Sequence, residues 1–189
     1  MQPTYSSRHQ TLHWLTVVCV LALIPLAWVM TNTKEGTSFS DGLYNWHETL
    51  GVIVLLLTGY RIIWRMIDKP PPLPISLARW DRALARSTYG LFYLILLWMP
   101  VTGYIAASAA GYTLKLFNLI DTPQLIGKNQ KLSDLMGFLH VCGQWMVYGL
   151  ILLHVGGVAC HLIWTKTGIL GRMLPSHATE PAAESDLRK

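Results

Sequence analysis

Five histidines lie inside long apolar segments of this 189-residue chain, where an ionisable side chain is costly and therefore indicates a function. Two more, His9 and His177, lie outside these segments, and we expect both to be solvated. A single intramembrane imidazole is more often a hydrogen-bonded contact between helices. The number and spacing of the five call for another explanation, and they are His13, His47, His140, His154 and His161.

The segments that carry these histidines are long enough to cross a membrane. The chain is 52% hydrophobic and only 13% charged, whereas soluble domains carry about 25% charged residues. A membrane span needs roughly 20 apolar residues. The sequence predicts an all-α fold, an integral membrane four-helix up-and-down bundle, with spans at about 12–30, 47–66, 89–110 and 135–164. The first span is too long for the apolar part of a cleaved signal peptide.

Basic residues alternate between the connections, with eleven on one side and four on the other. Because positive residues stay in the cytoplasm, we expect both termini and the connection at 65–88 to be cytoplasmic. Residues 1–175 are expected to form one domain, followed by a polar, disordered tail at 176–189. Segment 112–117, on the opposite side, is either an interfacial segment or an ordinary loop packed over the bundle.

The direction of each span predicts the depth of its histidine. His13 opens the first span on the cytoplasmic side, whereas His47 and His140 open the second and fourth spans on the opposite side. His154 follows His140 by fourteen residues, which is roughly 21 Å along a helix and about 40° short of four full turns. His47 should therefore pair with His140 on the outer side, and His13 with His154 on the cytoplasmic side.

Two imidazoles at one depth, on two helices, are what a six-coordinate haem needs, because the porphyrin supplies the other four nitrogens. Zinc or copper also binds imidazole, but two ligands are too few for a closed metal site. Glu48 is the only carboxylate near either pair. Three cysteines (Cys19, Cys142 and Cys160) lie in spans without the spacing of a metal or c-type haem site.

Glycines beside the histidines have two interpretations. Small residues let a flat macrocycle approach a helix, and they also let two helices pack closely. Both interpretations apply equally to Gly51, Gly143, Gly156 and Gly157.

Two more residues face the cytoplasmic site. Arg61 follows His47 by fourteen residues, so its guanidinium could pair with a haem propionate, or it could simply extend to the membrane surface. His161 follows His154 by seven residues and lies about 10 Å nearer the cytoplasm. Its imidazole suits a quinone site, where protons accompany electrons, but it could equally bind a propionate or a lipid headgroup.

The order and spacing of these residues resemble the bacterial cytochrome b561 family. The likeness covers about residues 5 to 175. It rests on Leu12-His13-Trp14, on Trp46-His47-Glu48-Thr49-Leu50-Gly51, and on His140 followed by His154 and His161.

This resemblance implies a di-haem b protein of the bacterial inner membrane that moves electrons between a periplasmic partner and the quinone pool. Superoxide-oxidising, ubiquinone-reducing enzymes belong to the family, and in them superoxide would donate an electron at the outer site. The resemblance makes His47 and His140 ligands of the periplasmic-side haem iron, and His13 and His154 ligands of the cytoplasmic-side iron. His161 becomes the quinone-site candidate. The expected partners are membrane lipid, quinone, and superoxide or another periplasmic redox donor, with no nucleic acid.

Charge does not favour superoxide, because an anion funnel should be basic. The outer loops balance Lys34, Lys115, Lys128 and Lys131 against Glu35, Asp41, Asp121 and Asp134. A second hypothesis is a haem b membrane anchor that relays electrons for a soluble dehydrogenase or hydrogenase. A third, a haem-free channel, has little support because no acidic residue lies within the apolar interior of a span.

Overall fold

Four long helices form the protein in a computed structural model that describes residues 4–165 and 168–174. They are α1 (Ser7–Thr31), α2 (Ser38–Ile67), α3 (Arg79–Ala110) and α4 (Gln130–Cys160), and a π-helical turn at His161–Thr165 extends α4. All four are long and apolar enough to cross a membrane. The predicted four-helix membrane bundle is therefore confirmed. His177 and the tail at 176–189 lie outside the described residues.

Each helix begins before its predicted span, because polar residues at the membrane surface continue the helix beyond the apolar core. The Thr37 side chain caps α2 by accepting a hydrogen bond from the Ser40 N–H, and Asn129 caps α4 through the Leu132 N–H. At its other end, α3 stops at Gly111, whose φ of +96° suits glycine.

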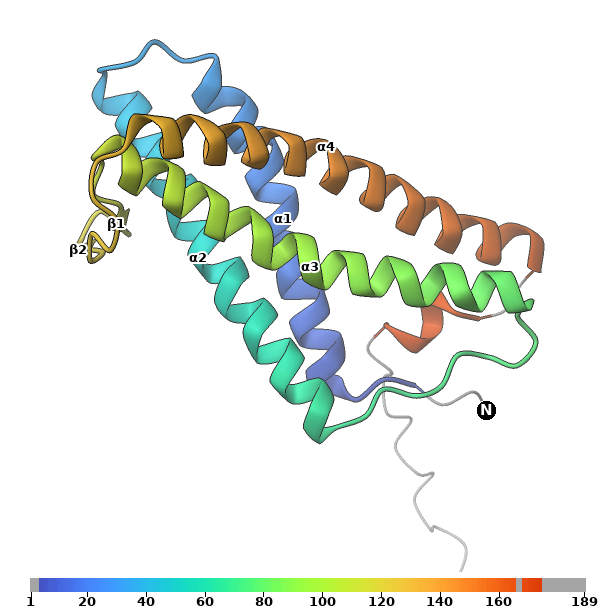
Figure 1. Ribbon diagram of the computed structural model, residues 1–189. Coiled ribbons are helices and arrows are strands. Elements are labelled where there is room, and N and C mark those ends of the chain that lie inside the picture. The colour runs from blue at the N-terminus through green and yellow to red at the C-terminus, as the bar shows by residue number, and fades with distance from the viewer. Residues whose placement is uncertain (1–3, 166–167, 175–189) are drawn as a thin grey trace, which may run out of the picture.

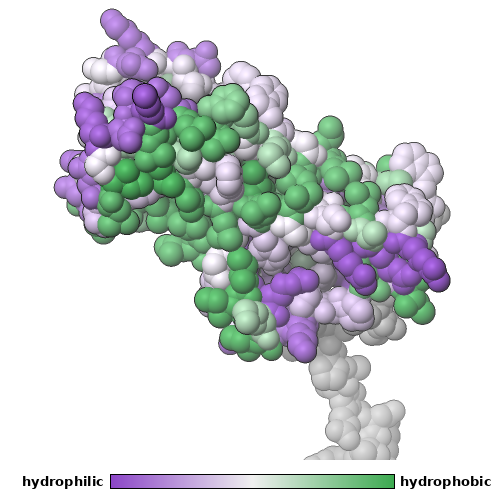
Figure 2. Space-filling model, viewed as in Figure 1, coloured by the Kyte–Doolittle hydropathy of each residue, from purple (hydrophilic) through white to green (hydrophobic). Residues whose placement is uncertain are grey.

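Neighbouring helices in the chain pack together, and α3 and α4 lie side by side (Figure 1). A small apolar core between α2, α3 and α4 contains Val54, Ile95, Leu96, Val147 and Leu150. On the face shown in Figure 2, apolar side chains cover the middle of the molecule and hydrophilic groups gather towards its two ends. This distribution is the one expected where lipid surrounds the helices.

A direct hydrogen bond joins α1 to α4. The Trp28 indole N–H donates to the Tyr148 hydroxyl at 2.9 Å. Gln144, one turn before Tyr148 on α4, donates to the same oxygen at 2.8 Å. The Tyr148 hydroxyl therefore accepts two hydrogen bonds, one from its own helix and one from α1, which otherwise makes few close contacts with α4.

Substituting Tyr148 by phenylalanine should lower stability, because both donors then lack their acceptor. We expect a loss of about 1–2 kcal/mol. At about 2–4 °C per kcal/mol for a chain of this size, the midpoint of thermal unfolding in detergent should fall measurably. Tyr60→Phe is the control, since the Tyr60 ring stacks on Trp64 and its hydroxyl makes no hydrogen bond to the described residues. Equal midpoints for the two variants would rule out a stabilising role for the Tyr148 hydroxyl.

The end of the bundle that carries His13 is closed by segments distant in sequence. Residues 168–174 fold back over the start of α1 (Figure 1). The Gln10 amide donates to the carbonyls of Arg172 and Leu174, and the Trp14 indole donates to the Met173 carbonyl. The buried Arg172 side chain donates to the Pro72 carbonyl in the connection between α2 and α3.

A short hairpin lies at the opposite end, between α3 and α4. Strands β1 (Lys115–Leu116) and β2 (Ile120–Asp121) pair in antiparallel register, Lys115 with Asp121 and Leu116 with Ile120. An all-α prediction did not anticipate it. The turn uses Phe117 and Asn118 with φ of +54° and +59°, and a phenylalanine at positive φ is not a recognisable turn signal.

Candidate functional site

The structure brings His47 of α2 and His140 of α4 together near the hairpin end of the bundle. Their ring centroids are 6.2 Å apart and their planes are inclined by 72°. These two residues are ninety-three positions apart in the sequence. Their meeting depends on the second and fourth spans entering the membrane from the same side.

His140 is held by α3. Its Nδ1 lies 2.9 Å from the Met99 carbonyl oxygen, to which only an N–H can donate, and 3.2 Å from the Thr102 hydroxyl. A proton on Nδ1 leaves the Nε2 lone pair available to a metal, and such a bond commonly orients metal-binding histidines. Gly103 makes room for the ring, because a Cβ there would lie 3.1 Å from His140 Cε1.

Met99, Thr102 and Gly103 were not identified from the sequence as parts of a site. The available signal was a threonine next to a glycine inside an apolar span, shortly after Pro100. That pattern is common in membrane helices. Only the packing of α3 on α4 shows that these residues contact His140.

His13 of α1 and His154 of α4 form a second pair near the other end. Their centroids are also 6.2 Å apart, with the planes inclined by 63°. The Phe92 ring of α3 packs edge-on against His154, with centroids 5.5 Å apart. The two pairs therefore have the same ring separation and share α4 as their common helix.

These separations suit a metal ion held between two imidazoles. Two rings that bind one ion from opposite sides, at about 2 Å per bond, have centroids roughly 6 Å apart. Within residues 4–165 and 168–174, no hydrogen bond joins the rings of either pair, and no cluster of three histidine, cysteine or acidic side chains could hold a bare metal ion. His47 Nδ1 is buried and has no protein partner there. The donor set therefore fits haem, which brings four nitrogens of its own.

Glycines near the pairs separate into two groups. A Cβ at Gly51 or Gly157 would meet no atom within 4 Å, so the protein itself does not require glycine for packing at these positions. At Gly143, by contrast, a Cβ would lie 2.5 Å from the Met99 sulfur. Gly143 therefore lets the Met99 side chain of α3 pack directly against the backbone of α4.

Known proteins are similar to this chain over almost its whole length. Residues 4–176 match the profile of the family described as prokaryotic cytochrome b561. The chain belongs to this family. It is also 29% identical over 174 residues to the protein named cytochrome b561 homolog 2 from Escherichia coli (strain K12), covering 89% of each chain. Membership implies a membrane protein of electron transfer that binds haem b.

Arg61 of this cytochrome lies close to the pair formed by His13 and His154. Its charge is close enough to interact with His13, and its guanidinium lies over the Tyr93 ring at 5.6 Å from the centroid. The side chain is partly buried between α2 and α3 rather than extended into solvent. This position suits pairing with an anionic group at the site, which is one of the two roles expected from the sequence.

His161 lies apart from both pairs of the cytochrome, at the start of the π-helical turn after α4. Its Nδ1 lies 2.9 Å from the hydroxyl of Thr165, a residue of the same turn. The contacts among the described residues bring no second helix to its ring. The quinone role of His161 therefore stays a prediction.

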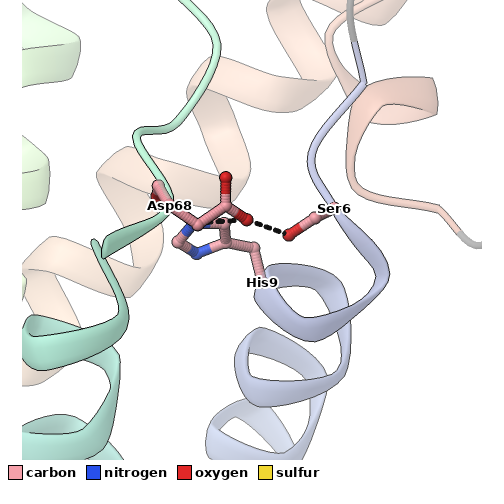
Figure 3. A network of polar contacts seen from close by, with 3 residues as sticks. All are labelled: Ser6, His9 and Asp68. Atoms are coloured by element: carbon pink, nitrogen blue, oxygen red, sulfur yellow. Dashed lines mark hydrogen bonds and ion pairs between the residues drawn. The ribbon is translucent and has the colours of Figure 1, made fainter. Parts of the chain in front are cut away.

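The prediction that His9 is solvated was wrong. Because α1 begins at Ser7, His9 lies one turn before His13 and packs against the end of α2, and its side chain is only 10% exposed. His9 Nε2 lies 2.8 Å from the Asp68 carbonyl oxygen and 3.8 Å from its carboxylate (Figure 3). The Ser6 hydroxyl donates to that carboxylate at 2.6 Å. Since Ser6 bonds the carboxylate and not the imidazole, the three residues are not a nucleophilic triad.

Proposed function

We propose that this cytochrome carries electrons across the membrane through two b haems, each held between two histidines. His47 and His140 would hold the haem near one surface, and His13 and His154 the haem near the other. Bound haem supplies reversible one-electron transfer at each level. The main support for the proposal is that two pairs of imidazoles, with the same ring separation, lie at two levels of one bundle.

The residues around each couple have separate tasks. Met99 and Thr102 fix the orientation of His140 through its Nδ1, and Phe92 limits the tilt of the His154 ring. Arg61 would compensate the negative charge of a propionate near His13. The apolar helices exclude water from both levels, which keeps the electrons from side reactions.

We further propose that the hairpin end faces the periplasm, because the basic residues concentrate at the opposite end. A periplasmic reductant, superoxide or another redox donor, would then deliver electrons near His47, and ubiquinone would accept them near His161. Lys115 does not contribute to a basic funnel, since it lies 3.7 Å from Asp121 in an exposed ion pair. The charge of Lys115 therefore gives no preference for superoxide over another donor.

The decisive experiment uses the purified chain reconstituted in phospholipid vesicles. A reduced-minus-oxidised spectrum with haem quantification should give about two b haems per chain. Superoxide should then drive ubiquinone reduction, and a chain with all four paired histidines replaced should not support it. Quinone reduction only when a co-purified soluble subunit is present would favour the membrane-anchor hypothesis instead. A colourless protein would refute the proposal.

A further inference from the structure

The hairpin between α3 and α4 packs against α2. The N–H of Phe117 donates to the Thr49 hydroxyl at 3.0 Å. Phe117 is the first residue of the turn after β1, so this hydrogen bond attaches the turn itself to a polar side chain of α2. Thr49 is only 1% exposed beneath the hairpin.

Helix geometry shows which side of α2 the hairpin covers. Thr49 follows His47 by two residues, which turns it about 200° around the helix. The hairpin thus lies on the flank facing away from His140. The Trp46 ring contacts the Phe117 ring edge-on at 6.3 Å, and on its other side Trp46 lines an apolar groove of about 410 Å³ with Pro25 and Val29 of α1. The hairpin continues the apolar outer surface of the bundle.

Several outward side chains of the hairpin and of the segment after it are apolar, whereas the exposed Lys115 and Asp121 form an ion pair at the end of the hairpin away from the turn. Leu119, Ile120 and Leu125 are 85%, 60% and 75% exposed, although each is a large aliphatic residue. A group of exposed apolar side chains commonly marks a surface that contacts a membrane or another protein. Phe117 and Asn118 also have positive φ values, a backbone conformation that non-glycine residues rarely adopt. Contacts with the rest of the protein must therefore stabilise the turn that exposes Leu119.

We propose that the hairpin Lys115–Asp121 is a membrane-interface anchor, with Leu119 and Ile120 among the acyl chains of the lipids that surround α2. The hydrogen bond from the Phe117 N–H to Thr49 suits this position, because lipid offers a backbone N–H no hydrogen-bond partner. Trp46, a residue type that favours the interface, contacts the same hairpin. Contact with lipid would then restrict the movement of the part of α2 that carries His47. The proposal rests on the membrane fold and not on the haem assignment.

Spin-label depth measurements test the position of the hairpin. Leu119→Cys would be labelled in the full chain, with Cys19, Cys142 and Cys160 replaced by alanine, in phospholipid vesicles. Leu56→Cys on α2 is the lipid reference, and Lys34→Cys in the connection between α1 and α2 is the aqueous reference. We expect the label at 119 to be relaxed by oxygen more than by a water-soluble nickel complex, as at 56. Accessibility to nickel like that at 34 would overturn the anchor.

A second part of the experiment distinguishes contact with lipid from contact with another copy of the chain. It also tests the hydrogen bond between the hairpin and Thr49. If the label at 119 is immobilised at a low lipid-to-protein ratio and released on dilution with lipid, the partner is a second chain and the proposal fails. Thr49→Val removes the acceptor of the Phe117 N–H with little change in size and should increase label mobility at 119. Thr58→Val, at a buried position of α2 whose hydroxyl has no protein partner within the described ranges, should not. Equal effects of the two substitutions on label mobility would show that Thr49 does not hold the hairpin.

Discussion

Substitution of His140 by alanine is expected to lower the haem content from about two per chain to about one. His47→Ala should remove the same haem, since one imidazole cannot replace the missing ligand on the opposite side. The structure places these rings 6.2 Å apart, with His140 oriented by the Met99 carbonyl. The double variant should lose no more than either single variant, because the two residues act on one group.

Haem quantification and low-temperature reduced spectra provide the measurement. His13→Ala and His154→Ala should together define the other haem by the same logic. His161→Ala should keep both haems, because its ring contacts neither pair in the described part of the chain. If His47→Ala and His140→Ala removed spectrally different haems, the pairing would be wrong even with the total content unchanged.

Substitution of Gly103 by valine should weaken haem binding at the His47–His140 level. The Cβ would lie 3.1 Å from His140 Cε1 and 3.3 Å from Nδ1, so the ring must move away from the Met99 carbonyl. Loss of a partner that orients a metal ligand typically costs 10–100-fold in affinity. We therefore expect haem affinity at this level to fall by about tenfold or more, with the other level unchanged.

Gly90→Val is the matched control for this substitution. Gly90 lies on the same helix, and a Cβ there would meet no atom within 4 Å. Both variants change helix propensity alike, so the difference between them reports the contact with His140. Haem titration of the apoprotein, monitored at each spectral component, measures the effect. Equal affinities for the two variants would show that Gly103 does not position His140.

Much of the arrangement could be predicted from the sequence because it depends on regular properties of single helices. Apolar length predicted the four membrane helices. Helix rise and rotation predicted that His140 and His154 share a face at two depths. Alternation of spans then predicted which histidine each would meet, and in the structure the rings of these partners lie together. None of these inferences requires knowledge of how the helices pack.

The remaining features were decided by tertiary structure, because they join residues far apart in the chain. The partner of His140 Nδ1 is a backbone carbonyl forty-one positions away, which no residue type can signal. The His9 side chain is largely shielded from solvent because it packs against Asp68 at the end of α2. The hairpin lies where the Thr49 hydroxyl of α2 accepts a hydrogen bond from the Phe117 N–H, sixty-eight positions away in the sequence. The spacing of residues determines the depth of each side chain and the face of the helix on which it lies. Contacts between segments depend instead on packing that only the folded chain defines.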